Sequence, residues 1–391
     1  MYHTAKYYTL WERFIHSSVK KYNTQGILML VDITTASPPF MVEQAKATEE
    51  LKKRMAVTPV AGRMIDMASH HSGISQRYFV VPDGGSGTEK KFYSNSGGYI
   101  SPDTGTRMNE YERWSKELTG NAVAEILAKN SVDPGSVERL ITISCTGFFA
   151  PGLDYYLIDR FNFPASVKRT NIGFMGCAAS LIGFNTVLES MSQLRSANGK
   201  TLLVSVELCS LHLQTEPTRD NILANMIFAD GCAAALFNSP SAASTGLQLL
   251  FTSSYLFKDS AEYMGWKIGN TGFEMVLSSE LPKIILNNAA PALKDILSQH
   301  QLSPEQITHW ALHPGGRAIL DSLQNGMNIS DEKMIPSRTV LKNYGNLSSA
   351  SILFVLKELM KNTPLKNDEL ICAVAFGPGL TMEVALLKVR A

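Results

Sequence analysis

The sequence lacks the features of a secreted, zinc-binding or nucleic-acid-binding protein. Its five cysteines are odd in number and include no Cys-x-x-Cys pair, and each lies in or beside an apolar segment. This pattern argues against a disulfide framework or a zinc site and favours a reducing cytoplasm. His70 and His71 have no partner at metal-ligand spacing, so no metal is expected. The 36 basic and 35 acidic residues give a formal charge of +1, which excludes a general attraction to nucleic acid.

Long apolar runs are also missing. No stretch reaches the about 18 residues of a membrane span. Residues 1–18 lack the apolar core and the cleavage site of a signal peptide. Trp11, Phe14, Ile15 and Val19 form a crude apolar stripe. The stripe predicts a first helix docked on the body or on a partner subunit, with contact to a membrane surface as the alternative.

The pattern that is present is an alternation of β-rich and helical segments. With 391 residues, 45% of them hydrophobic and 18% charged, the chain is long enough for two domains or one large double unit. The predicted strands are 26–34, 137–145, 166–174, 200–209, 231–238, 307–312, 369–376 and 380–389. The predicted helices are 109–130, 178–194, 280–300 and 349–362. This alternation predicts an α/β fold with largely buried strands.

The polar stretch 239–246 divides the alternation into two series. We therefore expect two related halves, residues 1–240 and residues 241–391. No close sequence repeat accompanies them, so the expected symmetry rests on the pattern of elements. Residues 303–306 have the form of a capping box, with Ser303 as the cap and Gln306 reaching back to it.

Cys177 is the first candidate for chemistry. It stands between an apolar run and a helix of small residues, with Gly176 before it and Ala178 and Ala179 after it. At a helix N-terminus the free amides and the helix dipole favour an anion. A thiolate there suits acyl transfer through a thioester. The alternative from this segment alone is a buried structural cysteine at a strand end.

Two polar residues in the second half occupy the same kind of position. His313 ends a strand before a Pro-Gly-Gly turn that opens a helix, and Asn346 follows a glycine just before another helix. Because such positions meet at one edge of an α/β sheet, we expect the two side chains and Cys177 to converge. A histidine can hold a thiolate as an ion pair. Histidine and asparagine together can donate hydrogen bonds to a developing oxyanion.

Four segments resemble the successive signatures of the type III polyketide synthases, the chalcone synthase superfamily. They are GFMGCAAS, WALHPGGRAILD, YGNLSSASILF and FGPGLTMEVALL, and they keep the order and spacing of the family from about residue 26 to the C-terminus. Residues 145–157 and 207–214 look closer to bacterial members that make alkylresorcinols or alkylpyrones than to the plant enzymes.

This resemblance implies a thiolase-type fold, in which two pseudo-symmetric halves form a layered αβαβα core, and a homodimer. It also implies a triad that works on CoA thioesters without a metal or other cofactor. Cys177 would hold the acyl-CoA starter and the growing chain, while His313 and Asn346 would form the oxyanion hole. Malonyl-CoA would lose CO2, and the enolate would attack the Cys177 thioester in a Claisen condensation.

The same resemblance implies roles for residues around the triad. Phe228 would stand between the CoA tunnel and the cavity, and Phe273 aligns less securely with a second such gate; core packing is the alternative for both. We interpret Ala150 and Cys209 as leaving room for an aliphatic chain, again with plain packing as the alternative. Ala375 replaces the first glycine of a family loop. The residues expected to line or border the cavity are Cys145, Ala150, Cys209, His212, Ser348, Gly377, Pro378 and Gly379.

CoA carries phosphates, so basic side chains are expected at the tunnel mouth. Arg63 matches a CoA-contact arginine of the family, although its lysine neighbours are not reproduced. Arg317 and Ala318, after the Pro-Gly-Gly turn, are also predicted at the mouth. The basic run 52–54 could replace the missing lysines, but such a run on a helix is usually a solvated face.

Two alternative functions stay open from the sequence. One is a ketoacyl synthase of the same fold that uses a carrier protein, and the other is a non-catalytic acyl-binding protein. The intact triad argues against the second, because a binding protein has no need of all three residues. The starter, the number of extensions and the choice between aldol and lactone closure depend on cavity shape, which one sequence does not fix.

Overall fold

The computed structural model describes residues 28–55, 58–84, 91–190, 199–238 and 245–390. The predicted first helix, with its apolar stripe, lies outside these residues. Within the described ranges, no helix combines the length and the apolar character that a membrane crossing needs.

In the described part of the chain, nine strands form one mixed sheet in the order β13-β14-β15-β10-β1-β9-β8-β6-β7. They are β1 (Leu28–Ala36), β6 (Val137–Ser144), β7 (Lys168–Gly173), β8 (Lys200–Leu208), β9 (Asp230–Asn238), β10 (Gly246–Leu256), β13 (His309–Leu312), β14 (Leu370–Gly377) and β15 (Thr381–Arg390). Three two-stranded sheets are β2 (Phe40–Glu43) with β3 (Gln76–Phe79), β4 (Ser94–Asn95) with β5 (Gly98–Tyr99), and β11 (Met264–Gly269) with β12 (Gly272–Leu277).

The helices surround and separate these strands. They are α2 (Gln44–Met55), α3 (Pro59–His71), α4 (Thr104–Lys129), α5 (Leu153–Phe161), α6 (Ala179–Ser190), α7 (Arg219–Ile227), α8 (Leu281–Ile284), α9 (Ala290–Gln299), α10 (Arg317–Met327), α11 (Asp331–Tyr344) and α12 (Ser351–Asn362). Short 3-10 turns include η3 (Gly176–Ala178), η5 (Cys209–His212), η7 (Pro304–Gln306) and η8 (Ser348–Ala350), and a π-helical turn, Ile285–Ala289, joins α8 to α9.

The predicted strands and helices are confirmed to within a few residues, and the capping box at Ser303 and Gln306 is present. Several elements were not predicted, among them α2, α7 and the β11–β12 hairpin. Helix α2 buries only Gln44, Thr48, Leu51 and Met55. Such a polar helix carries little apolar periodicity, so its sequence gives a weak signal.

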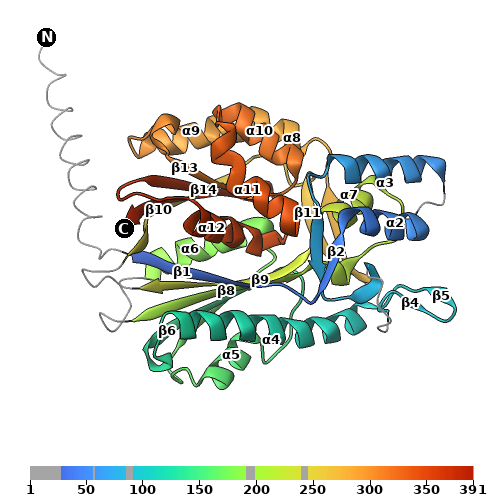
Figure 1. Cartoon of the computed structure of the whole chain (residues 1–391), viewed down its shortest axis with the longest axis horizontal. Helices are drawn as coiled ribbons and strands as arrows, with labels where there is room; N and C mark the ends of the chain where they lie inside the picture. The colour runs from blue at the N-terminus through green and yellow to red at the C-terminus, as the bar shows by residue number, and fades with distance from the viewer. Residues whose placement is uncertain (1–27, 56–57, 85–90, 191–198, 239–244, 391) are drawn as a thin grey trace, which may run out of the picture.

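The elements stack in five layers, which Figure 1 shows from one outer face to the other. Helices α4 and α5 cover the part of the sheet made by β1, β9, β8, β6 and β7. Helices α6 and α12 follow, then the part made by β10, β15, β14 and β13, and finally α8, α9 and α10. This arrangement confirms the predicted layered α/β fold of the thiolase type. The predicted boundary at residue 240 falls outside the described residues and stays a prediction.

The middle layer is buried on both sides. The apolar faces of α6 and α12 pack between the two parts of the sheet in one continuous core. Gly183 of α6 allows this close packing, because an added Cβ would lie 2.5 Å from Leu203 Cδ1 and 3.0 Å from Ile143 Cδ1. The two parts of the sheet join where Leu28–Leu30 pairs with Leu247–Leu249.

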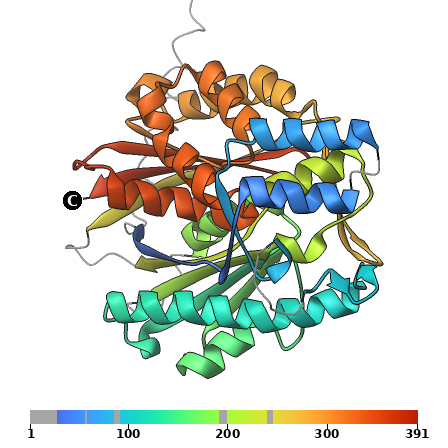
Figure 2. The ribbon, with the colours of Figure 1, turned by 45° about the vertical axis from the view of Figure 1, so that its right-hand side comes forward.

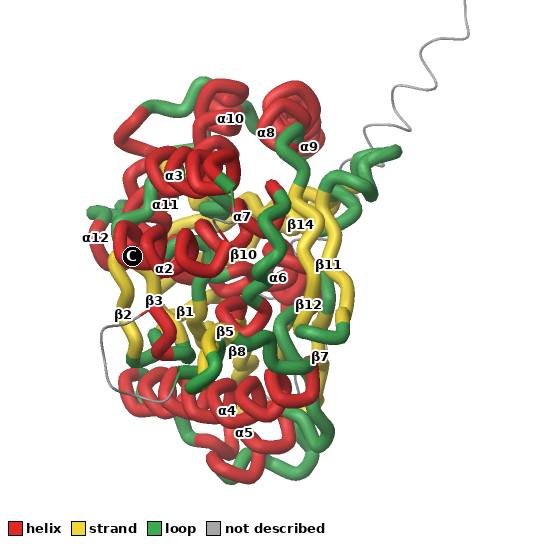
Figure 3. The backbone as a smooth tube through the Cα atoms, turned by 90° about the vertical axis from the view of Figure 1, so that its right-hand side faces the viewer, coloured by secondary structure: helices red, strands yellow, loops and turns green. Residues whose placement is uncertain are grey.

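One end of the layered core carries a separate group of elements. Figure 2 brings α2, α3 and α7 forward, and Figure 3 shows them facing the viewer with the β11–β12 hairpin beside them. Helices α2, α3 and α7 contact one another, and α7 also contacts β12. We call α2, α7 and the β11–β12 hairpin the cap.

The buried middle layer gives a stability prediction. Phe184 is fully buried in α6 and meets Phe237 edge-on at 5.1 Å between ring centroids. Phe184→Ala should lower the free energy of unfolding by about 3–5 kcal/mol, measured by chemical denaturation. Ile335→Ala, on an exposed side chain, should change it by less than about 1 kcal/mol. Equal effects of the two substitutions would contradict this packing.

Candidate active site

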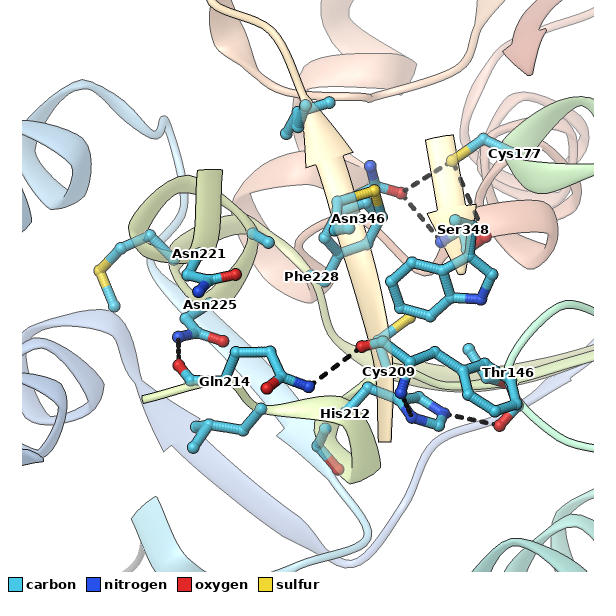
Figure 4. A pocket seen from close by; sticks show the side chains of 18 of the residues that line it. Thr146, Cys177, Cys209, His212, Gln214, Asn221, Asn225, Phe228, Asn346 and Ser348 are labelled. Atoms are coloured by element: carbon cyan, nitrogen blue, oxygen red, sulfur yellow. Dashed lines mark hydrogen bonds between the residues drawn. The ribbon is translucent and has the colours of Figure 1, made fainter. Parts of the chain in front are cut away.

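A cavity lies between the layered core and the cap. Figure 4 shows 18 of the residues that line it. Cys177, His313 and Asn346 all contribute to its wall, together with side chains from α2, α7 and the β11–β12 hairpin. The three residues come from two halves of the chain, so the predicted convergence of these side chains is confirmed.

Cys177 lies in η3, directly before α6. Its Sγ is 3.9 Å from Asn346 Oδ1 and 3.8 Å from Ser348 Oγ. Gly176 precedes it with a φ of +59°, and a Cβ there would lie 2.4 Å from Pro378 Cδ. The turn that presents the thiol therefore requires glycine, both for its backbone conformation and for the close approach of Pro378.

Asn346 is held by its own main chain and by the start of α12. Its backbone N–H donates to Ile227 O at 2.8 Å, and its backbone carbonyl accepts from Ala229 N at 2.8 Å. Its side-chain Oδ1 accepts from Ser348 N at 2.9 Å. Because Oδ1 is engaged, the amide orientation is fixed, and Nδ2 points toward Gly315 O at 3.5 Å. One amide N–H is left to donate to a substrate.

His313 directly follows β13 and lines the same cavity as Cys177 and Asn346. Its side chain is 2% exposed, and neither Nδ1 nor Nε2 has a hydrogen-bond partner among the described residues. Gly315 packs against the ring, since a Cβ on this glycine would lie 3.4 Å from His313 Cδ2. A buried polar side chain without a partner costs stability, so this arrangement is typical of a residue kept for chemistry.

Burial shifts the ionisation of both groups. Burial raises the pKa of the Cys177 thiol to about 12 and lowers the pKa of His313 to about 3. The predicted helix-terminus effect, a thiol pKa lowered toward the thiolate, is therefore wrong for the resting site. Loss of solvation outweighs the helix dipole when the thiol is buried. At rest the pair is a neutral thiol and a neutral imidazole.

The two predicted gate residues both border the cavity. Phe228 lies at the end of α7, and buried Arg77 donates from Nη1 to its carbonyl at 2.6 Å. Phe273 of β12 is buried and stacks on His212 with ring centroids 4.3 Å apart. His212 Nδ1 accepts from Phe273 N at 2.9 Å, and Nε2 contacts Thr146 O at 2.7 Å. Both ring nitrogens of His212 are thus engaged, and burial lowers its pKa to about 3, so it is a neutral wall residue.

The other predicted cavity residues divide into two groups. Cys145, Cys209, Ser348 and Pro378 line the cavity as expected. Cys145 lies behind the reactive turn, where its Sγ accepts from Gly176 N at 3.2 Å. Gly377 and Gly379 flank Pro378 without lining the cavity themselves.

Ala150 does not enlarge this cavity. It is exposed, precedes Pro151 in the connection before α5, and is absent from the cavity wall of this chain. The interpretation that Ala150 leaves room for an aliphatic chain is not supported by the cavity of one chain and stays a prediction. The sequence places Ala150 only five residues from Cys145, but the chain turns outward between them.

The predicted CoA-contact residues lie outside the cavity wall. Arg63, Arg317 and Ala318 are exposed, and Arg317 Nε lies 3.6 Å from Asp321 Oδ2. Their contact with CoA stays a prediction. Arg54 does line the cavity, with a side chain that is 5% exposed and an Nη2 that lies 3.3 Å from Asp83 Oδ1.

Glu207 is a buried residue near the site that the sequence did not suggest. Its carboxylate accepts hydrogen bonds from Cys145 N at 3.0 Å, from Thr146 Oγ1 at 2.9 Å and from Ser349 Oγ. Burial raises its pKa to about 7 despite these donors. Residues 207–214 resemble bacterial members of the family, but the sequence assigns no role to Glu207, because its hydrogen-bond partners lie in segments that are distant in the sequence.

Within the described ranges, no group of three or more His, Cys, Asp or Glu side chains is placed to hold a metal ion. The chemistry that the site offers is that of a thiol, an imidazole and an amide in a largely apolar cavity. A thiol can carry an acyl group, and the imidazole and the amide can move its proton and stabilise an oxyanion.

Comparisons with known proteins agree with this geometry. Residues 63–251 match the family described as FAE1/Type III polyketide synthase-like protein, and residues 248–390 match the C-terminal domain of chalcone and stilbene synthases. A putative chalcone synthase of Bacillus subtilis is 31% identical over 259 residues, which cover 64% of this chain and 70% of that protein. The chain belongs to the type III polyketide synthase family.

Two further members of the family cover nearly the whole chain. A 1,3,6,8-tetrahydroxynaphthalene synthase of Streptomyces peucetius is 29% identical over 360 residues, 91% of this chain and 92% of that enzyme. The crystal structure of PKS-I from the brown alga Ectocarpus siliculosus has a TM-score of 0.85 at 27% identity and covers 94% of this chain and 99% of that one. This chain is accordingly a type III polyketide synthase, an acyltransferase that works on CoA thioesters.

The raised pKa of Glu207 gives a pH prediction. The unfolded carboxyl loses its proton near pH 4.5, whereas the folded one keeps it to about pH 7, so folding loses stability as pH rises between these values. Glu207→Gln removes this ionisation. Relative to the wild type, the free energy of unfolding of the variant should rise by about 3 kcal/mol between pH 4.5 and 7 and should not change further above pH 7. Parallel stability curves from denaturant titrations would contradict this.

Proposed function

We propose that this synthase loads an acyl-CoA starter on Cys177 and extends it with malonyl-CoA by decarboxylative Claisen condensations. Cyclisation then gives a product of the alkylresorcinol or pyrone type. The observation that carries the proposal is the placement of Cys177 Sγ 3.9 Å from Asn346 Oδ1, in one buried cavity with the unpartnered ring of His313.

Loading needs a thiolate, and His313 supplies the base. Transfer of the Cys177 proton to His313 creates opposite charges within one cavity, which keeps the same net charge. The sulfur then attacks the starter carbonyl and forms the thioester. The proton from His313 leaves with the CoA thiol, and the site returns to its neutral state.

Extension needs a stabilised enolate. Malonyl-CoA loses CO2, and the electron pair of the broken bond passes to the thioester oxygen. His313, neutral at pH 7, has one ring N–H to donate, and Asn346 has one free amide N–H. The enolate carbon attacks the acyl group on Cys177, and the thiolate leaves. Each such donor is worth about 3–4 kcal/mol in comparable oxyanion holes.

The cavity wall supports an aliphatic starter. Away from the reacting groups it is built largely of apolar side chains, which favour an alkyl chain over a charged or polyhydroxylated one. Cys209, as interpreted from the sequence, is one of the small residues along this wall. The apolar side chains on the α2 and α7 side are Ala47, Leu51, Phe79, Val81, Leu213 and Met226.

A product assay tests this proposal. Purified enzyme with labelled malonyl-CoA and acyl-CoA starters from C2 to C18 should form polyketides without a carrier protein, with medium or long chains favoured. Cys177→Ala should lower product at least about a thousandfold, because no acyl-enzyme forms. Acyl label on Cys177 without product would indicate a carrier-dependent condensing enzyme. Binding that survives the substitution, without turnover in either protein, would indicate an acyl-binding protein.

We also propose that the enzyme is a homodimer. Within the described residues, β7 lies at the edge of the nine-stranded sheet and pairs with β6 alone. Phe148 and Met175 are 40% and 45% exposed, and Phe148 stacks on Phe174 next to this edge. An unpaired edge strand beside exposed apolar side chains favours a second copy as the cover. The five free thiols support the expected cytoplasmic location, which stays a prediction.

Light scattering coupled to gel filtration tests the dimer. The wild type should have the mass of two chains at micromolar concentration, and Phe148→Asp should shift it to one chain by placing a charge in the contact. Ile335→Asp, on another exposed apolar residue, should leave the mass unchanged. A wild type with the mass of one chain would contradict the proposal.

A further inference from the structure

Arg77 of β3 caps the C-terminal end of α7. The last hydrogen bond within this helix runs from Phe228 N to Ala224 O, so the carbonyls of residues 225–228 need partners from elsewhere. Arg77 Nη1 donates to two of them, Asn225 O at 2.8 Å and Phe228 O at 2.6 Å. A cation is also favourable at this end, where the helix dipole is negative.

The other two carbonyls have partners on either side of Arg77. Gln44 of α2 accepts from Arg77 Nε at 3.0 Å and donates from Nε2 to Met226 O at 2.8 Å. The backbone N–H of Asn346 donates to Ile227 O at 2.8 Å. The end of α7 is therefore held by two side chains, those of Arg77 and Gln44, and by the main chain of Asn346.

Arg77 also packs against the residue that precedes Asn346. A Cβ on Gly345, whose φ is +72°, would lie 2.9 Å from both Cγ and Cδ of Arg77. Phe228 and Asn346 form an isolated β-bridge, and Figure 4 shows them next to each other. The arginine therefore contacts the chain on both sides of the bridge that carries the predicted gate and the oxyanion-hole amide.

The guanidinium of Arg77 is buried, with 2% of the residue exposed, and its three acceptors are neutral oxygens. Burial lowers the pKa of Arg77 to about 9, against the opposing effect of the Asp230 charge, so the side chain keeps its proton at pH 7. Burying a charge is costly, and charged donors make strong hydrogen bonds. Loss of this side chain would leave two buried carbonyls unpaired.

We propose that Arg77 is a positioning residue for the extension step, because it fixes the end of α7 and through it the places of Phe228 and Asn346. Nδ2 of Asn346 has to lie within hydrogen-bond distance of the enolate oxygen. A displacement of about 1 Å can cost about a hundredfold in rate. The inference rests on the proposed function and adds a residue to it.

Release of CO2 from labelled malonyl-CoA, with an acyl-CoA starter present, tests this role in turnover. Arg77→Met keeps an apolar stem and removes the donors. It should lower kcat at least about tenfold and change KM less than about threefold, because the interaction lost is one made in the transition state. Arg77→Lys should have a kcat at least about threefold above that of Arg77→Met, because a single nitrogen serves both carbonyls of α7 in the wild type.

Arg107→Met is the matched control. Arg107 is also fully buried and donates to backbone carbonyls, Pro102 O at 2.8 Å and Leu211 O at 2.8 Å, but these lie outside α7. Its loss should leave kcat within about threefold of the wild type. Alkylation of Cys177 by iodoacetamide should keep its wild-type rate in all three variants. An equal fall in kcat in Arg77→Met and Arg107→Met would overturn the inference.

Hydrogen exchange tests the positioning without turnover. The backbone amides of Asn346 and Ala229 bond across the bridge. Peptides that cover residues 227–230 and 344–348 should exchange at least about tenfold faster in Arg77→Met than in the wild type, and the control should match the wild type. Unchanged exchange would contradict the inference. A wild type that releases no CO2 would instead sink the proposed function, and the exchange comparison would then decide the positioning role alone.

Discussion

The active site depends on two helices that are packed between the two parts of the sheet. Helices α6 and α12 fill the layer between the two parts of the sheet. A movement of either helix would therefore disturb its packing against both parts of the sheet. Each begins in a 3-10 turn, η3 or η8, and these turns touch. Cys177 belongs to the first turn and Ser348 to the second, which places their side-chain atoms 3.8 Å apart. The packing of the middle layer thus fixes the distance on which the chemistry depends.

Burial also sets the electrostatics. The same loss of solvation raises the pKa of Cys177 and of Glu207 and lowers the pKa of His313. A lone charge is costly in such a place, whereas a proton moved from Cys177 to His313 creates a pair with no net charge. This accounts for a nucleophile that is neutral at rest and activated within the pair. It also favours loss of CO2 from a desolvated malonyl carboxylate, whose negative charge passes to an oxygen beside the donors.

The sequence was sufficient to predict the alternating fold and the meeting of Cys177, His313 and Asn346, because all three follow strand or loop ends that enter helices. The sequence also indicated that Gly176 belongs to the turn that presents Cys177. The ionisation of Cys177 could not be predicted, because a helix terminus is visible in the sequence whereas the burial of a side chain is not. The local pattern also does not show that the chain turns outward at Ala150, which is exposed.

A residue whose contacts come from distant parts of the chain could not be given a role from the sequence. Glu207 lies in β8, a strand that reads as ordinary core. Its hydrogen-bond partners, Cys145, Thr146 and Ser349, come from the end of β6 and from η8. A sequence motif predicts a local turn well, but it does not predict a cavity wall that is assembled from α2, α7 and β12.

Alkylation of Cys177 as a function of pH tests the central claim, that His313 activates this thiol. The rate with iodoacetamide is followed by mass spectrometry of the Cys177 peptide in the wild type and in His313→Ala. The wild type should react at a nearly constant rate between pH 6 and 8 (about twofold variation), because the proton moves from Cys177 to His313 within the pair and the number of protons that the pair holds does not change across this range. In His313→Ala the buried thiol, with a pKa near 12, should react slowly at pH 7 and about tenfold faster per pH unit up to pH 9. The same pH dependence in both proteins would contradict the account.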